Sequence, residues 1–289
     1  MGLMTLGDLR TQVKDHIPDM SNDKIDRVGN IIVKQIARKA GKPQRSTFTT
    51  LPQYQTGTVT VTQDANTLAF AGGASIDAGY DGGLIQVDGD DTWYTFSRTD
   101  ATNGTLSSNW PATTAAGSTY ILVQPFVALG TDVLRLHRIW RDDTYELNWA
   151  SDEIVLQQAY FFSPGRPEWF APTEFGVTSG ALQVQLIRAP DDRYSYTYSF
   201  TKRPTLFTAG DTSSVTSLPE DYDDVTLFGT LWMLFDQDDS PGRAGPWWQQ
   251  YQLALQELKA ELTADANTQF EQADRGPVLR RIYHNYPVN

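Results

Sequence analysis

The chain contains no cysteine, and its 289 residues include only three histidines. Without cysteine it can form no disulfide, no thiolate nucleophile and no cysteine-ligated zinc site, which is typical of proteins assembled in a reducing cytoplasm. His16, His137 and His284 fall in three separate predicted elements, and none belongs to a metal-binding or catalytic-triad motif. There is also no phosphate-binding glycine loop. We therefore expect no metal, no cofactor and no catalytic activity.

Long apolar runs are missing as well. No stretch approaches the roughly 20 apolar residues that a membrane-spanning helix requires. The N-terminal sequence MGLMTLGDLR lacks a basic region followed by an apolar core. We expect neither a signal peptide nor a membrane partner.

Charge is unevenly distributed along the chain. The formal net charge is -12, yet residues 1–45 hold nine basic and five acidic side chains, and residues 275–289 hold three arginines and no acid. The remaining middle segment is therefore strongly acidic. Tight binding to a phosphate backbone requires clustered Lys and Arg, which the middle segment does not supply. DNA is expected to pass close to this protein without being bound tightly.

Two amphipathic helices are predicted near the N-terminus. Thr5 is a suitable cap for the first, which Pro18 limits, and Ser21 or Asn22 for the second, which ends near Gly41 and Pro43. Their apolar stripes are Leu6, Leu9, Val13 and Ile17, followed by Ile25, Val28, Ile32 and Ile36.

Two further helices are predicted near the C-terminus. One begins at Pro219 and is apolar through Phe235, and the Asp238–Gly245 stretch breaks it. Pro246 then opens the final helix, whose apolar stripe is Tyr251, Leu255, Leu258 and Leu262.

The sequence between these helices favours strands. Alternation predicts strands over 58–62, 84–87, 92–96 and 120–123, with a turn at residues 88–91. A second β region covers roughly 127–217. Within it one strand face is aromatic and needs a packing partner; its residues are Tyr194, Tyr196, Tyr198 and Phe200.

The predicted fold class is α+β: a helical bundle of N- and C-terminal helices, with a large inserted antiparallel β region and an extended C-terminal tail. The predicted boundaries are 1–45 for the N-terminal helices, 46–126 for an inserted β-module, 127–217 for the second β region, 218–268 for the C-terminal helices and 269–289 for the tail.

Two sets of residues are candidates for contacts with other molecules. Adjacent helical residues point about 100° apart, so at least one ring of Trp247 and Trp248 should face outward, which favours a subunit interface. The tail after the last helix is too apolar for a solvated segment and is expected to order on a partner. Its candidate binding residues are Arg275, Val278, Leu279, Arg280, Arg281, Ile282, Tyr283 and Tyr286.

Several segments, taken in order, resemble the head-to-tail adaptor (head-completion or connector) proteins of tailed bacteriophages, including the tail tubular A-like proteins. They are LGDLRTQVKDHIPDMSNDKIDRVGNIIVKQIARKA, GRPEWFA, APDDRYSYTYSFTKRPTLF, SLPEDYDD and WWQQYQLALQELKAEL. The stretch from GTVTVTQDANTLAFAGG to TAAGSTYILVQ resembles a β-insertion found in some of these proteins.

The resemblance implies a structural virion protein of the neck, between head and tail, assembled in the host cytoplasm. It implies a ring of identical subunits, usually twelve, that docks on the portal protein through its C-terminal segment. A tail or nozzle protein would bind the other side, and genomic DNA would pass through the channel without sequence-specific binding.

Two other classes stay open at this point. A carbohydrate-binding virion adhesin would use the many Trp and Tyr side chains to stack on sugars. A tail-associated hydrolase would use a pair of carboxylates at the separation that glycosidic cleavage requires, which a sequence does not reveal.

Overall fold

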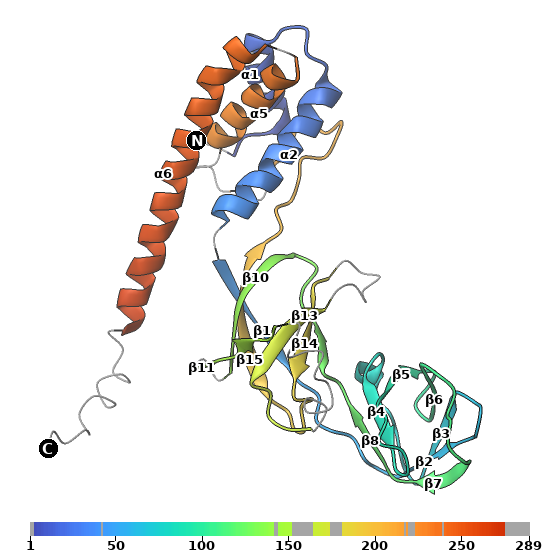
Figure 1. The fold of residues 1–289 in the computed structure, drawn as a ribbon. Coiled ribbons are helices and arrows are strands. Elements are labelled where there is room, and N and C mark those ends of the chain that lie inside the picture. The colour runs from blue at the N-terminus through green and yellow to red at the C-terminus, as the bar shows by residue number, and fades with distance from the viewer. Residues whose placement is uncertain are drawn as a thin grey trace, which may run out of the picture. The chain divides into compact units, whose positions relative to one another are not determined.

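A computed structural model describes residues 3–41, 43–141, 144–151, 164–173, 181–216, 218, 223–238 and 240–274. The chain forms two compact units (Figure 1). Unit 1 combines the two ends of the chain, residues 1–43 and 201–289, and unit 2 consists of residues 44–200.

Unit 1 is built on four helices that are far apart in the sequence. They are α1 (Leu6–His16), α2 (Asn22–Ala40), α5 (Asp223–Gln237) and α6 (Pro241–Asp274). Helix α1 packs on α2 and α5, and α5 packs on both α2 and α6. The buried residues of the two N-terminal helices include the predicted ones Leu6, Leu9, Val13, Ile25, Val28, Ile32 and Ile36.

The start of α1 is fixed by a capping box. The Asp8 backbone N–H donates to the Thr5 hydroxyl at 3.1 Å, and the Thr5 N–H donates to the Asp8 carboxylate at 3.0 Å. These bonds satisfy two backbone donors that a helix N-terminus otherwise leaves free. The predicted cap is confirmed.

The predicted start of the final helix is wrong. Helix α6 begins at Pro241 and contains Pro246 within it. Pro241 occupies the first helical position, where the missing N–H costs no hydrogen bond. Pro246 lacks the N–H that would bond to the carbonyl of Gly242, so one hydrogen bond of the first turns is absent. The helix also continues to Asp274, so the first residues of the predicted extended tail are helical.

Helix α5 comes very close to its neighbours at Gly229. A Cβ atom at this position would lie 2.7 Å from Ile32 Cγ2 on α2 and 3.0 Å from Tyr251 Cε2 on α6. The first distance is shorter than Cβ contacts in proteins, and the second is at their lower limit. The glycine therefore allows α5 to pack this closely against α2 and α6, and a larger residue would force Ile32 or Tyr251 to shift.

The segment before α5 is hydrogen-bonded to both N-terminal helices. The Asn30 side chain on α2 accepts from the Phe207 N–H at 2.9 Å and donates to the Phe207 carbonyl at 3.1 Å. The N–H groups of Leu6 and Gly7 donate to the carbonyls of Ser214 and Thr212, both at 2.8 Å. These bonds join parts of the chain about two hundred residues apart in sequence.

The first part of unit 2 is a seven-stranded antiparallel sheet. Its order is β7-β2-β3-β6-β5-β4-β8. The strands are β2 (Thr58–Val61), β3 (Thr67–Ala71), β4 (Leu84–Val87), β5 (Tyr94–Arg98), β6 (Asn103–Leu106), β7 (Ala115–Ser118) and β8 (Tyr120–Val123), with a short 3-10 helix η1 (Ala78–Tyr80).

This sheet curls back on itself. Its two edge strands, β7 and β8, are separated in the chain by Thr119 alone, so the two edges of the sheet must meet. Gly117, with a φ of 69°, provides backbone freedom at this point. Closure of this kind surrounds a core from all sides and leaves little exposed edge. The core includes Val59, Phe70, Ile85, Phe96 and Trp110.

The second part of unit 2 is a sandwich of two four-stranded sheets. One has the order β1 (Pro43–Thr49), β15 (Ser195–Lys202), β10 (Val133–Arg141) and β11 (Tyr145–Glu146). The other has the order β12 (Asn148–Trp149), β13 (Trp169–Thr173), β14 (Gln183–Ile187) and β9 (Phe126–Ala128). Residues of both sheets share one buried core.

The aromatic face of β15 finds its partner inside this core. Tyr196, Tyr198 and Phe200 are buried, and the Tyr196 ring stacks on Phe48 of β1 with ring centroids 5.2 Å apart. The need for a packing partner, predicted from the alternation, is confirmed. That partner is intramolecular.

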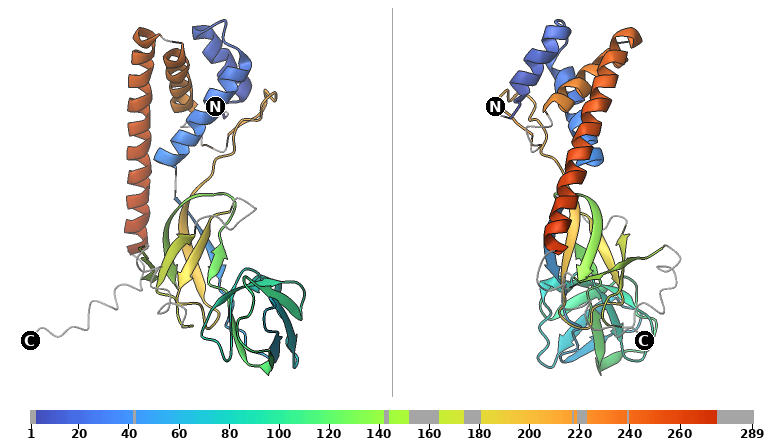
Figure 2. Two further views of the ribbon diagram at one scale, coloured as in Figure 1. Left: turned by 45° about the vertical axis from the view of Figure 1, so that its right-hand side comes forward. Right: turned by 90° about the vertical axis from the view of Figure 1, so that its left-hand side faces the viewer.

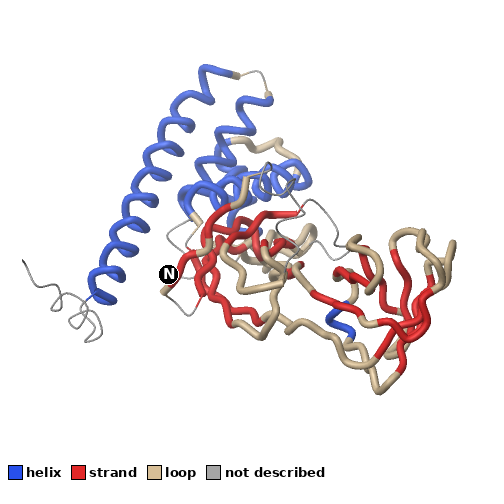
Figure 3. Tube along the Cα trace, turned by 60° about the horizontal axis from the view of Figure 1, so that its bottom comes forward, coloured by secondary structure: helices blue, strands red, loops and turns tan. Residues whose placement is uncertain are grey.

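The predicted fold class is wrong. The described residues form fifteen strands in three sheets against four α-helices, so this is a mostly β protein and not a helical bundle with a β insertion (Figure 3). Helical stripes are long and visible in a sequence, whereas many strands here have only two to five residues. Strand β1 is almost entirely exposed and shows no alternation at all.

Candidate interaction surfaces

The adjacent residues Trp247 and Trp248 on α6 have different environments. Trp247 is half-buried, and its ring lies 4.8 Å from His16 at the end of α1 and 6.0 Å from Phe228 on α5, measured between ring centroids. Trp247 is therefore part of the packing between helices of unit 1.

Trp248 lies at the edge of an aromatic cluster. It is 39% exposed, and its ring centroid lies 4.4 Å from that of Trp232 on α5. Tyr251 stacks on Trp232 at 5.8 Å and is fully buried, and the Lys39 ammonium lies 5.8 Å from the Tyr251 ring centroid. An exposed tryptophan packed against other aromatic rings is the kind of residue that dominates protein interfaces.

The outward side of α2 carries a basic stripe that we did not identify as a candidate site from the sequence. Arg27, Ile31, Lys34 and Arg38 are all exposed and recur at intervals of four, three and four residues. That spacing places them along one line on a helix. Within the described part of the chain, the three cations have no ion-pair partner. The same periodicity was available in the sequence, opposite the buried stripe.

Helices α2 and α6 run parallel. Lys24, near the start of α2, forms a 2.7 Å ion pair with Asp238, just before α6, and Lys39, near the end of α2, lies over Tyr251. Helix α6 has 34 residues, about 50 Å, while α2 has 19 and α5 has 15. Residues 259–274, which we call the distal part of α6, therefore continue beyond α2 and α5 (Figures 1 and 2).

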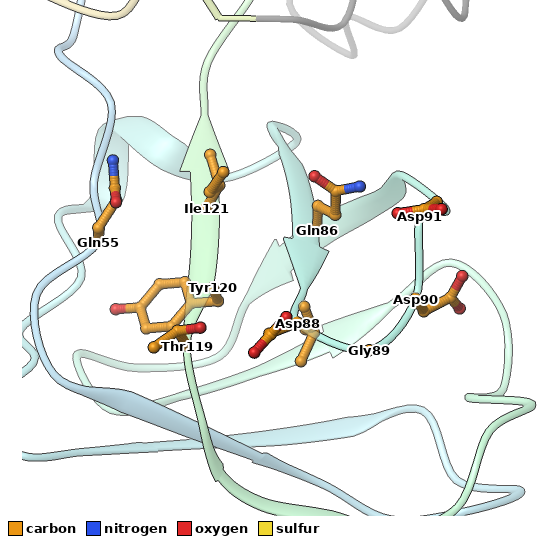
Figure 4. A pocket seen from close by; sticks show the side chains of 10 residues that line it. Gln55, Gln86, Asp88, Gly89, Asp90, Asp91, Thr119, Tyr120 and Ile121 are labelled. Carbon is orange, nitrogen blue, oxygen red and sulfur yellow. The ribbon is translucent and has the colours of Figure 1, made fainter.

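A shallow polar pocket of about 260 Å³ lies on the seven-stranded module, beside the turn between β4 and β5 (Figure 4). The Asp88 N–H donates to the Thr119 carbonyl at 2.9 Å, which joins the turn to the start of β8. Three carboxylates line the pocket, those of Asp88, Asp90 and Asp91.

Asp90 is held as an ionised hydrogen-bond acceptor. It accepts from the Tyr94 hydroxyl at 2.6 Å and from the Thr92 N–H at 2.9 Å. Partial burial acts to raise the pKa of Asp90, but these hydrogen bonds outweigh it and hold the pKa below its ordinary value. A glycosidic general acid needs the opposite shift, so Asp90 is unsuited to that role.

The two described histidines lie on different elements of different units. His16 ends α1 and His137 lies on β10, while His284 is outside the described residues. Burial, with Arg135 and Arg138 nearby, lowers the pKa of His137 and favours its neutral form. In the described ranges no group of three or more His, Asp or Glu side chains is placed to hold a metal ion. No helix there is long and apolar enough to cross a membrane.

The candidate tail residues lie outside the described part of the chain. These are Arg275, Val278, Leu279, Arg280, Arg281, Ile282, Tyr283 and Tyr286. Their role as a binding segment stays a prediction.

Comparison with known families identifies the class of protein. Residues 104–278 match the family model described as SU10 adaptor protein, a span of more than half the chain. The chain belongs to the SU10 adaptor protein family, whose members are structural adaptor proteins of phage virions. No curated protein matches the sequence.

The matched span covers parts of both units of the fold. It begins in β6 and includes every strand of the sandwich except β1, together with helix α5 and all of α6. Most of the seven-stranded module, together with α1 and α2, precedes it. Membership in a phage adaptor family implies contacts with other components of the virion.

Proposed function

We propose that this chain is the subunit of a ring, with twelve copies, that docks on the portal at the head-to-tail junction and connects it to the tail. The observation that carries the proposal is the family match over residues 104–278. The resemblance to tail tubular A-like proteins supports the place at the neck.

The surfaces of unit 1 support assembly from identical copies. Trp248 and the basic stripe of α2 are exposed, and the distal part of α6 extends past the other helices of its own unit. A free subunit that leaves such surfaces uncovered is suited to bury them against neighbours.

Charge supports a channel that DNA traverses without binding. The net charge is -12, and the basic residues are concentrated near the two ends of the chain. A conduit with a net negative potential repels phosphate groups and so disfavours stalled DNA.

Contact with the portal is assigned to the C-terminal segment from Arg275 onward. Three arginines and several large apolar residues in fifteen positions suit a segment that orders on a protein partner. A tail or nozzle protein would bind elsewhere on the ring, on a surface that we do not assign.

The test is the assembly state with and without purified portal protein. Mass photometry and electron microscopy should show a closed ring, alone or on the portal, with one mass that is a fixed multiple of the 32.3 kDa chain. A strictly monomeric protein under both conditions contradicts the proposal. Binding on a glycan array, or turnover of polysaccharide, would instead support the adhesin or the hydrolase.

A further inference from the structure

The basic stripe of α2 is unusual for a protein of this composition. The chain is strongly acidic, yet Arg27, Lys34 and Arg38 follow one line of α2 and surround Ile31, which is 36% exposed. A large apolar side chain among exposed cations has the character of an interface, with an apolar centre and a charged rim.

The distal part of α6 has the complementary character. Residues 259–274 contain four acidic side chains and one lysine. Leu262, Ala266 and Phe270 recur at intervals of four residues, the spacing of an apolar line on a helix. This segment is a regular helix in the structure.

The two elements also match in length. The stripe from Arg27 to Arg38 spans about 16 Å of helix, and the sixteen residues from Lys259 to Asp274 span about 24 Å. The distal part of α6 is thus long enough to cover the whole stripe with residues to spare.

The basic stripe of α2 and the distal part of α6 cannot contact each other within one copy. Because α2 and α6 run parallel, with Lys39 beside Tyr251, Ile31 lies alongside the first turns of α6. From there to Leu262 the distance along the helix axes is on the order of 25 Å. Each copy therefore presents both elements without being able to join them.

We infer that, in the ring, the basic stripe of α2 binds the distal part of α6 of a second copy. The inference rests on the proposed assembly of identical subunits and names the contact that joins them. Because each copy donates one element and accepts the other, the contact is head-to-tail, and repetition of such a contact closes a ring when the rotation allows it.

Duplex DNA is the other occupant that a basic stripe could take. Three cations on one helix neutralise few phosphates, and the apolar Ile31 in their midst has no use on a phosphate backbone. An acidic helix with an apolar line would pair with the three cations and also cover Ile31.

The absence of cysteine from the chain permits a direct test by disulfide cross-linking. Chains carrying Ile31→Cys are mixed, under assembly conditions with portal protein, with differently tagged chains carrying Leu262→Cys, Ala266→Cys or Phe270→Cys. Oxidation should give a covalent heterodimer with at least one of the three, since a disulfide requires the two Cα atoms within about 7 Å. The matched control is Leu253→Cys, which is 60% exposed on the same helix but precedes the distal part.

A charge exchange provides a second readout that needs no cysteine. The pair Lys34→Glu and Arg38→Glu should cause loss of the ring, as should the pair Glu261→Lys and Asp265→Lys. The four substitutions together should restore it, because the attraction is re-established with opposite signs. Circular dichroism of each variant separates loss of assembly from loss of the fold.

The outcomes distinguish the inference from the proposed function. Rings that form without any of the three cross-links, or that survive either charge pair, overturn the α2–α6 contact and leave the ring intact. No ring under any condition overturns both. Binding of a labelled duplex that the Lys34→Glu and Arg38→Glu pair abolishes, without cross-linking between copies, assigns the stripe to DNA and overturns the contact.

Discussion

Arg10 on α1 and Asp26 on α2 form a bidentate ion pair. The guanidinium Nε lies 2.8 Å from Asp26 Oδ1, and a terminal guanidinium nitrogen lies 2.5 Å from Asp26 Oδ2. The two side chains are only 13% and 6% exposed. Hydrogen bonding to Asp26 raises the pKa of Arg10 above its already high value, so the arginine is always charged. The pair fixes α1 against α2.

We expect Asp26→Ala to lower the free energy of unfolding of unit 1 by about 3 kcal/mol, because it leaves a largely covered arginine without its partner. Urea unfolding followed by circular dichroism in the helical band measures this. Replacing both partners, Arg10→Met with Asp26→Leu, should recover most of the loss. Asp15→Ala, at an exposed position of α1, is the control and should have little effect. Equal effects at Asp15 and Asp26 contradict the interpretation.

Gly229→Ala should destabilise unit 1 by roughly 1–3 kcal/mol, since the added methyl clashes with Ile32 and crowds Tyr251. Gly242→Ala on α6 is the matched control, because nothing lies within 4 Å of its Cβ. There the better helix propensity of alanine should leave stability unchanged or raise it by up to about 1 kcal/mol. Thermal unfolding of the two variants side by side decides between propensity and sterics, and similar shifts at both sites would refute the steric argument.

Thr5→Ala should cost about 1 kcal/mol at neutral pH, the usual effect of losing a helix cap. The dependence on pH follows from Asp8. Its pKa is lowered in the folded protein by the hydrogen bonds from Thr5. Its contribution is therefore fully present above its ordinary pKa of about 4 and is lost as the pH falls through the lowered value. The difference in stability between wild type and Thr5→Ala should shrink at low pH, as the bond from the Thr5 hydroxyl to the Asp8 carboxylate weakens. It should not vanish, because the hydroxyl also accepts from the Asp8 N–H whatever the charge of Asp8. Gln12→Ala is an exposed control. A constant difference across the pH range contradicts a role for the Asp8 carboxylate.

Trp247→Ala and Trp248→Ala should have separable effects. Trp247 packs between His16 and Phe228, so its loss should lower the free energy of unfolding by about 2 kcal/mol. Trp248 is more exposed, and its substitution should weaken ring assembly while the fold persists. Chemical unfolding and mass photometry on both variants provide the comparison. Normal assembly of Trp248→Ala would remove this residue from the interface.

Deletion of residues 275–289 should leave the fold and the ring intact but abolish binding to the portal, because α6 ends at Asp274 and the deleted segment is the proposed portal contact. Replacing Arg275, Arg280 and Arg281 by alanine should slow association more than it changes the final affinity. Surface plasmon resonance on immobilised portal measures both rates. Unchanged binding by the truncated chain, or loss of its fold, contradicts the assignment.

The sequence by itself determined the local elements whose causes are local. The Thr5 cap, the stripe of α2 and the alternation of β15 could be identified because capping and periodicity depend on residues a few positions apart. The final helix was predicted to begin at Pro246, whereas it begins at Pro241. Proline is tolerated throughout the first turn of a helix, so the sequence does not show which of the two prolines marks the start.

Only the tertiary structure decided what those elements meet. The near-closure of the seven-stranded sheet depends on which strands pair, and the alternation within strands of four or five residues does not reveal their partners. The ion pair of Arg10 with Asp26, the glycine between Ile32 and Tyr251, and the reach of α6 beyond α2 likewise depend on how helices are placed in space. A one-dimensional pattern fixes which face of an element is apolar, whereas the fold decides which faces find partners within the chain and which are left for another molecule.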